Sequence, residues 1–126
     1  MGAKRPRPVV LDAGALIAID RADRRVIRLL ELAGGVHIPA GALAQAWRNP
    51  ARQVRLGRVV AAAGVDIHPL DALQARAAGQ LCGATGSSDV VDASVVLVAR
   101  TVDGVAVTSD SDDLRRLDPG LPLAAC

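Results

Sequence analysis

Three aspartates border apolar segments of the chain, and their placement suggests metal chemistry. Asp12 follows the apolar run at residues 9–11, Asp110 follows the run at 105–107, and Asp92 opens the apolar stretch between them. Hard divalent cations such as Mg²⁺ prefer oxygen ligands and usually take one or two protein carboxylates. Acids gathered at one place repel one another unless a cation or protons neutralise them. We therefore treat the three as candidate metal ligands at equivalent strand-to-helix junctions, with helix caps and turn acids as the alternative.

The elements that must position these acids alternate along the sequence. Short apolar runs predict strands at residues 9–11, 36–38, 65–69 and 105–107, with an edge strand at 121–125. Helical periodicity and end signals predict helices at residues 13–19, 24–33, from 39 to a break at 49–50, 51–63, 71–82, 90–100 and 112–117, with a loop at 83–88. This alternation predicts a parallel α/β sheet with right-handed crossovers. The 126 residues suit a single domain, 1–126, in which residues 1–8 form a basic arm.

The composition is that of a globular protein, with 51% hydrophobic and 22% charged residues. Phe and Tyr are absent and Trp47 is the only tryptophan, so an aromatic platform for stacking RNA bases is not expected. The net charge of +2 is too small to establish a polyanionic partner. The positive charges are almost all on arginines, whose guanidinium groups can bind phosphates through two hydrogen bonds. Codon bias also explains the preference for arginine over lysine.

The cysteines and histidines show no recognisable motif. Cys82 and Cys126 are far apart and have no zinc-site spacing, and His37 and His68 are interpreted as ordinary strand residues. We find no signal peptide and no run of about 18 apolar residues that would predict a membrane helix. We therefore expect a cytoplasmic protein without a membrane partner.

Three segments together resemble the PIN-domain ribonucleases, most closely the toxins of bacterial toxin–antitoxin pairs. They read VVLDAGALIAID, SSDVVDASVVLVAR and GVAVTSDSDDL, and the resemblance covers nearly the whole chain. It implies a three-layer α/β/α sandwich with a central, mainly parallel sheet. It also implies an acid cluster that binds Mg²⁺ or Mn²⁺ and hydrolyses single-stranded or loop RNA, leaving a 5′-phosphate.

The resemblance assigns roles to five residues. Asp12, Asp92 and Asp110 match three acids of the family, which makes them candidate catalytic residues and metal ligands. Thr108 matches a hydroxyl residue that precedes the last acid, and Gln45 stands in the segment where the family usually has a glutamate. An amide can coordinate but lacks the charge, so weaker metal binding is expected. A catalytically weak or inactive PIN-like module that binds RNA or protein therefore remains the alternative function.

Other acids lie near these positions. Asp89 precedes Asp92 by three residues, so both lie on one face of a helix. Asp89 is thus a further candidate metal ligand that could supply the missing charge, or it is a helix cap. Asp112 and Asp113 are interpreted as turn acids or caps. A phosphorylation-receiver domain also places acids at strand ends, but it requires a late lysine, and Lys4 is the only lysine here.

A series of arginines provides candidate contacts with RNA. Arg48, Arg52 and Arg55 recur at helical spacing and form a basic stripe near the acids if the Asn49-Pro50 interruption is only a bend. A solvated helix face is the alternative. From the resemblance we expect an RNA substrate, a small antitoxin and a homodimer, and we interpret Trp47 as a core or interface residue.

Overall fold

Five short strands carry the apolar runs of the sequence, and every pairing between them is parallel. The computed structural model describes residues 5–126. The strands are β1 (Val9–Leu11), β2 (Val36–Pro39), β3 (Val65–His68), β4 (Val105–Thr108) and β5 (Leu123–Ala125), in the order β3-β2-β1-β4-β5. All three residues of β1 are buried, because a central parallel strand is covered on both faces.

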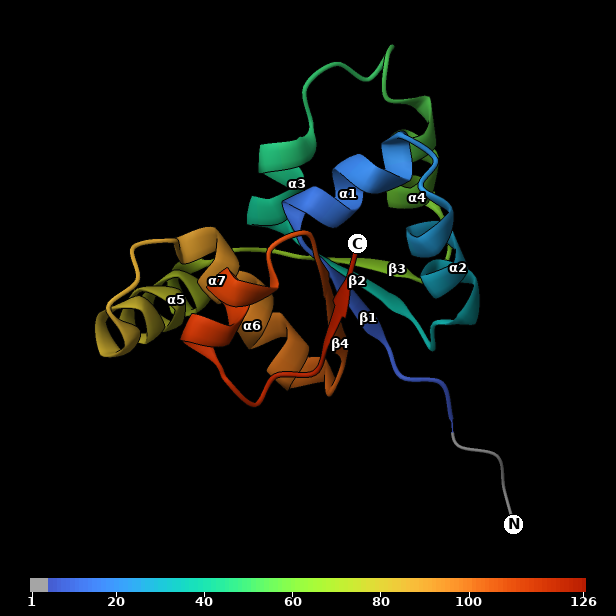
Figure 1. The fold of residues 1–126 in the computed structure, drawn as a ribbon. Helices are drawn as coiled ribbons and strands as arrows, with labels where there is room; N and C mark the ends of the chain where they lie inside the picture. Colours follow the sequence, from blue (N-terminus) through green and yellow to red (C-terminus); the bar gives the residue numbers. More distant parts are fainter. Residues whose placement is uncertain (1–4) are drawn as a thin grey trace.

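Seven helices cover the two faces of this sheet (Figure 1). One face carries α1 (Ala13–Asp20), α2 (Arg24–Leu32), α3 (Ala40–Ala46) and α4 (Val54–Ala61). The other face carries α5 (Ala72–Thr85), α6 (Val90–Val102) and α7 (Ser111–Leu117). Parallel neighbours require such helical crossovers between successive strands. The predicted three-layer α/β/α sandwich is confirmed, and the sheet is parallel throughout.

The strand order reverses direction beside β1. The strands β2 and β3 follow β1 in the sequence and lie on one side of it, whereas β4 and β5 come later and lie on the other side. The pairing of β1 with β4 continues past the strand, since the backbone N–H of Asp12 donates to the carbonyl of Val107 at 3.2 Å. In open α/β sheets, ligands bind beyond the carboxyl ends of the strands at such a reversal. Asp12 and Thr108 lie at this point.

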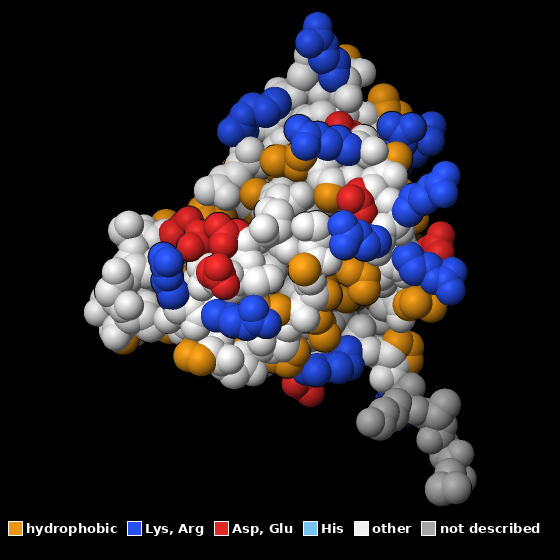
Figure 2. Space-filling view, in the orientation of Figure 1, with side chains coloured by type: hydrophobic (Ala, Val, Ile, Leu, Met, Phe, Trp, Pro, Cys, Tyr) orange, Lys and Arg blue, Asp and Glu red, His pale blue; other side chains and the backbone are white. Residues whose placement is uncertain are grey.

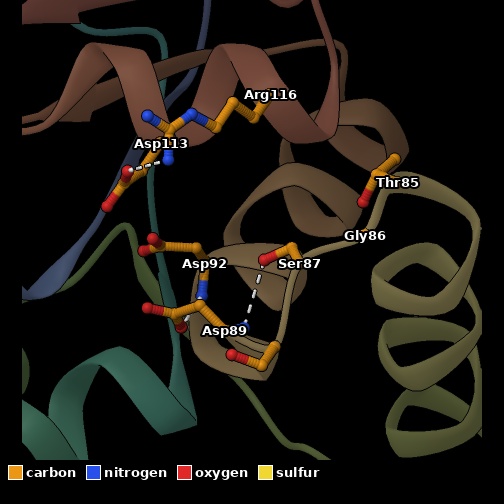
Figure 3. A pocket seen from close by; sticks show the side chains of 8 residues that line it. Thr85, Gly86, Ser87, Asp89, Asp92, Asp113 and Arg116 are labelled. Atoms are coloured by element: carbon orange, nitrogen blue, oxygen red, sulfur yellow. Dashed lines mark hydrogen bonds and ion pairs between the residues drawn. The ribbon is translucent and has the colours of Figure 1, made fainter.

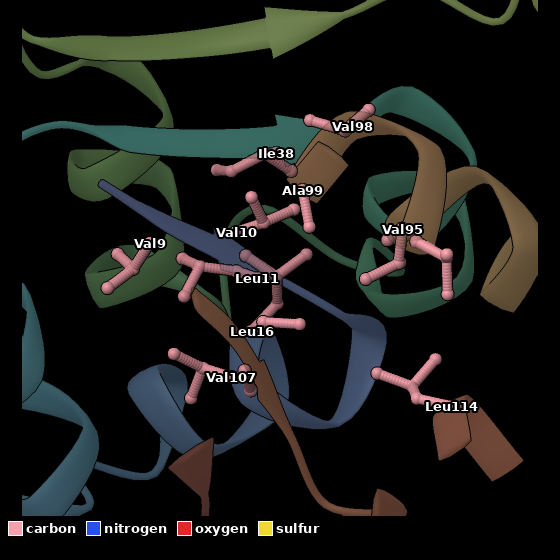
Figure 4. Packing of buried hydrophobic residues seen from close by; sticks show 14 of the residues in the cluster. Val9, Val10, Leu11, Leu16, Ile38, Val95, Val98, Ala99, Val107 and Leu114 are labelled. Carbon is pink, nitrogen blue, oxygen red and sulfur yellow. The ribbon is translucent and has the colours of Figure 1, made fainter. Parts of the chain in front are cut away.

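Aliphatic side chains fill most of the space between the layers (Figure 4). Leu11, Leu16 and Ile38 are fully buried, as are Val95 and Val107. Helix α6 packs against β1, β2 and β4, which explains why its sequence is apolar on most sides. This close-packed core fixes the strand ends that carry the acids.

Some predicted element boundaries are wrong. Helix α5 continues to Thr85 instead of ending at Cys82, because Gly83 is accommodated within the helix and Gly86 terminates it in the left-handed conformation (φ 72°). Helix α4 begins at Val54 instead of residue 51.

The predicted basic arm falls partly outside the described residues, because Lys4 precedes them. The part described is held against the domain by an ion pair between Arg7 and Asp103 at 3.2 Å. Among residues 5–126 no single helix is long and apolar enough to span a membrane. Helices α5 and α6 satisfy that criterion only as a pair, and they are bent by 107°.

Candidate active site

Asp12 directly follows β1 and is the N-cap residue of α1. Its Oδ1 accepts a hydrogen bond from the backbone N–H of Ala15 at 2.8 Å, and the residue is only 6% exposed. Burial raises the pKa of Asp12 above its ordinary value, although hydrogen bonds from Thr108 and from nearby backbone N–H groups oppose the shift. The cap predicted as an alternative is therefore present, and it fixes the orientation of a buried carboxylate.

Thr108 connects two of the predicted acids. Its buried hydroxyl is bonded to the side chain of Asp12, and its Oγ1 accepts from the backbone N–H of Asp110 at 2.9 Å. Because a hydroxyl has one donor and can also accept, it serves both partners at once. The Thr108 hydroxyl thereby connects the end of β4 to the end of β1.

Asp92 lies in the first turn of α6, behind the cap formed by Asp89. Oδ1 of Asp89 accepts from the backbone N–H of Asp92 at 2.9 Å, and the N–H of Asp89 donates to Oγ of Ser87 at 3.1 Å. Burial, followed by the charge and hydrogen bond of Asp89 and the charges of Asp12 and Asp113, raises the pKa of Asp92 to about 7. The interpretation of Asp89 as a cap is confirmed, yet the same residue also perturbs Asp92.

The junction that leads to Asp92 differs from the expectation. Asp12 follows β1 directly and Asp110 follows β4 after one intervening residue, whereas Asp92 is reached from α5 through the turn at residues 86–89. The three acids therefore do not occupy equivalent strand-to-helix junctions. They approach one region because α6 packs across the sheet with its N-terminus near the carboxyl ends of the strands.

Asp110 and Asp113 share the start of α7. Asp110 is exposed and caps the helix, with its Oδ1 accepting from the backbone N–H of Asp113 at 3.3 Å. The hydrogen bond and charge of Asp110 raise the pKa of Asp113, and the guanidinium of Arg116, 3.6 Å from Oδ1 of Asp113, opposes this shift. Asp113, which we interpreted from sequence as a turn acid or cap, thus joins Asp12, Asp89, Asp92 and Asp110 in one group of carboxylates, which we call the acid cluster.

A hollow of about 260 Å³ lies between the beginnings of α6 and α7 (Figure 3). The carboxylates of Asp89, Asp92 and Asp113 point to the same side of the close-up, and Arg116 lies along α7 above them. In the space-filling view the acidic side chains form one red group at this place (Figure 2). The other residues that line the hollow are Thr85, Gly86, Ser87 and Ser88.

The remaining predicted residues lie outside this hollow. Gln45 is exposed near the end of α3, one turn beyond Gly41, whose face of the helix packs against Val91 of α6. Gln45 therefore projects from the side of α3 that faces the N-terminal part of α6. It is not among the residues that line the hollow.

The three arginines do not form a stripe along one helix. Arg48 follows the end of α3 and donates to the carbonyls of Ala44 and Trp47, Arg52 lies in the loop before α4, and Arg55 lies on α4. The interruption at residues 49–50 is therefore a loop and not a bend. Figure 2 shows basic side chains around this upper end of the molecule, apart from the acidic group.

The donor set of the acid cluster fits a divalent cation. Three carboxylates line one hollow, and a fourth (Asp12) acts on the pKa of Asp92, which is raised by burial first and then by the neighbouring carboxylates. Carboxylate oxygens are the ligands that Mg²⁺ and Mn²⁺ prefer. Within residues 5–126, no three acidic, thiol or imidazole groups already lie at coordinating distances. Metal binding would therefore draw the carboxylates together.

The raised pKa of Asp92 predicts an unusual pH dependence of stability. Between its ordinary value of 3.8 and about 7, the folded state holds a proton that the unfolded chain has released. The free energy of unfolding therefore falls as the pH rises through this interval. Since Asp92 is half-exposed, we reduce the full effect for solvent screening and expect a loss of roughly 1–2 kcal/mol.

Urea unfolding without divalent metal, at pH values from about 4 to 8, measures this effect. Asp92→Asn should flatten the profile, because asparagine does not titrate. Stability that increased steadily with pH over this range would contradict the interpretation.

Comparisons with known proteins agree with this architecture. The family model described as PIN domain matches residues 9–119. VapBC2 from Rickettsia felis, solved with a DNA fragment from its promoter, shares 18% identity, with a TM-score of 0.68 over 94% of this chain and 98% of that chain. VapC20 from Mycobacterium tuberculosis, described as a toxin that cleaves the sarcin–ricin loop, shares 17% identity, with a TM-score of 0.64 over 90% and 95% of the two chains.

A third similar structure is FitAcB from Neisseria gonorrhoeae, with 16% identity and a TM-score of 0.60 over 91% of this chain and 95% of that chain. Identities this low show a shared fold and do not transfer a substrate. No curated protein matches the sequence at a significant level. Since the family model covers most of the chain and the observed parallel sheet agrees with the resemblance seen in the sequence, the chain belongs to the PIN-domain family.

Proposed function

We propose that this protein is a metal-dependent endoribonuclease of the PIN type, which acts as a toxin. The observation that carries the proposal is the convergence of Asp12, Asp89, Asp92 and Asp113 at the β1–β4 reversal, where Asp92 has a pKa of about 7. Burial and the charges of neighbouring carboxylates together raise this pKa, and such perturbed groups cluster at functional sites. The similarity to a toxin described as cleaving the sarcin–ricin loop supports an RNA substrate.

The residues of the site have different proposed roles. Asp12 and Asp92 would hold Mg²⁺ or Mn²⁺, and Asp89, Asp110 and Asp113 would provide further carboxylate oxygens. When bound, the ion lowers the pKa of a water ligand and neutralises charge on the phosphodiester. The N-cap bond from Ala15 and the hydroxyl of Thr108 hold the Asp12 carboxylate in one orientation.

Arginines near the hollow would position the substrate. Arg116 lines the hollow beside Asp113, so its guanidinium can bind a phosphate oxygen next to the acid cluster. Arg52 and Arg55 are exposed farther away and would contact the flanking RNA backbone. Arg48 already donates to two backbone carbonyls, so its contribution to RNA binding would be smaller.

The proposed partners follow from the resemblance to toxins of two-component systems. We propose a small antitoxin that neutralises the nuclease, a homodimeric toxin and a cytoplasmic location. Trp47 is half-buried beside a hollow of about 300 Å³ whose other lining residues are Ala40, Leu43, Ala44 and Val60. This apolar surface is compatible with an interface role for Trp47.

The direct test is cleavage of a mixed RNA pool by purified protein, with Mg²⁺, with Mn²⁺ and with EDTA. Cleavage should require metal and should leave 5′-phosphate ends, which ligation of an adaptor to the products detects. RNA binding without cleavage in any metal would favour the inactive PIN-like module.

Gln45→Glu should strengthen metal-dependent cleavage. The substitution adds a carboxylate on the face of α3 that packs near the start of α6, and each additional charge stabilises a bound cation. We expect the metal concentration for half-maximal cleavage to fall about 3- to 10-fold, equivalent to roughly 1 kcal/mol. Gln80→Glu, on the exposed surface of α5, is the matched control and should leave this concentration unchanged. Equal values for Gln45→Glu and the control would show that position 45 does not reach the metal.

A further inference from the structure

Two histidines from neighbouring strands face each other away from the acid cluster. Nδ1 of His37 on β2 lies 2.8 Å from Nε2 of His68 on β3, and the ring centroids are 5.0 Å apart with a tilt of 53°. Oδ2 of Asp66 lies 3.8 Å from the same Nδ1 of His37. These are the two histidines of the sequence. Two ring nitrogens and a carboxylate oxygen therefore meet at one place.

The sheet register explains this arrangement. His37 is paired with Asp66, and His68 follows Asp66 by two residues along β3. Side chains two residues apart on a strand project from the same face of the sheet, so all three groups share one face. The rigid parallel pairing of β2 and β3, and not a flexible loop, sets the distance between the imidazoles.

The separation of the two nitrogens suits a shared metal ion. Zinc–nitrogen bonds measure about 2.0–2.1 Å, so two nitrogens 2.8 Å apart subtend an angle of about 85–90° at an ion placed between them. That angle fits neighbouring positions of an octahedral or tetragonal ion, and a tetrahedral ion would require the nitrogens to separate to about 3.3 Å. From this juxtaposition we infer that His37 and His68, with Asp66, form a second metal site that binds a borderline transition-metal ion such as Zn²⁺, with the two nitrogens moving apart to the tetrahedral separation on binding.

The protonation of the pair is compatible with coordination. Burial, followed by the charge of His68, lowers the pKa of His37, and a neutral imidazole is the form that binds metal. Whichever ring donates the hydrogen bond between the two nitrogens, its proton moves to the other nitrogen of the same ring when the ion binds, so no proton is lost. This exchange replaces one hydrogen bond with two metal–nitrogen bonds.

The surroundings leave room for the remaining ligands. A hollow of about 160 Å³ lies beside His68, between the start of α5 and helix α6, and can hold water ligands. Asp66 is exposed and can turn toward the imidazoles, which is required because no three such groups in residues 5–126 already lie at coordinating distances. Water and one carboxylate would complete the coordination of an ion held by the histidines.

This site differs chemically from the acid cluster. Imidazole nitrogens favour Zn²⁺, Ni²⁺ and Cu²⁺, whereas an all-carboxylate set favours Mg²⁺ and Mn²⁺. The groups that shift the pKa of His37 are His68 and Asp66, and no acid of the cluster acts on it. The inference therefore does not depend on the proposed nuclease activity.

Calorimetric titration of the EDTA-stripped protein with Zn²⁺, in the presence of excess Mg²⁺ to occupy the acid cluster, tests the inference. We expect one Zn²⁺ per chain and at least about 10-fold weaker binding in both His37→Gln and His68→Gln. Asp12→Asn is the matched control and should bind Zn²⁺ as the original chain does. Unchanged affinity in both histidine variants, or loss of binding in Asp12→Asn alone, would overturn the inference.

A second measurement requires no substitution, in case a histidine variant fails to fold. Because the chain has two histidines, the imidazole nitrogen signals in a ¹⁵N NMR spectrum consist of two sets. One equivalent of Zn²⁺ should shift Nδ1 of His37 and Nε2 of His68 strongly. If neither nitrogen shifts, the pair is only a hydrogen bond and the proposed site does not exist.

Discussion

Asp92→Asn is expected to abolish RNA cleavage and at the same time to stabilise the protein above neutral pH. The loss of one charged ligand removes metal affinity and stabilisation of the developing charge, together worth several kcal/mol, so cleavage should fall at least about 100-fold. The asparagine carries no charge, so it avoids both the cost of burying a charge and the repulsion by neighbouring carboxylates that raise the pKa of Asp92 to about 7. After allowance for solvent screening, we expect a gain of about 1 kcal/mol in the free energy of unfolding at pH 8.

Cleavage assays and urea unfolding at pH 8, without added metal, measure the two effects on the same preparation. Asp112→Asn is the matched control, since it lies in the first turn of α7, is exposed and does not line the hollow. The control should retain activity. A fully active Asp92→Asn would remove Asp92 from the catalytic residues, whereas an inactive but destabilised variant would point to a structural role.

Substitutions of Asp12 should separate its charge from its role as a helix cap. Asp12→Asn retains a side-chain oxygen that can accept from the N–H of Ala15, and Asp12→Ala does not. Both should lose cleavage by at least about 100-fold, because neither has the negative charge. The alanine variant should be less stable than the asparagine variant by about 1 kcal/mol, the usual value of an N-cap.

Thermal unfolding in EDTA compares the two variants without any effect of bound metal. Asp71→Ala removes the equivalent cap of α5, where Asp71 accepts from the N–H of Gln74 at 2.8 Å, and therefore serves as a control for cap loss alone. It should be destabilised and active. Cleavage by Asp12→Asn close to that of the original chain would show that the charge at this position is not used.

The sequence predicted the sheet, the parallel direction of its strands and the family because these depend on local signals. Runs such as residues 9–11 and 105–107 are apolar on both faces, as central parallel strands must be. Asp12 was identified because it stands at the end of such a run, and Thr108 was identified from the resemblance to the family. Their hydrogen bond, however, follows from the pairing of β1 with β4, which connects positions almost a hundred residues apart.

Features that depend on tertiary packing were not predicted from the sequence. Asp113 joins the acid cluster because α7 packs beside α6, and an acid in the first turn of a short helix resembles an ordinary cap. The spacing of Asp110 and Asp113, three residues apart, was the one signal that could have placed both on one helix face. Likewise, His37 and His68 showed no motif because two separate strands contribute them.

The position of β1 between β2 and β4 has a consequence for biosynthesis. A nascent chain that has been translated only as far as Gly104 can pair β1 with β2 alone, and it lacks Thr108 and Asp113. The acid cluster can assemble only after β4 and α7 have been added. The proposed nuclease is therefore inert while the preceding elements are being translated, which protects the ribosome and the messenger RNA that produce it.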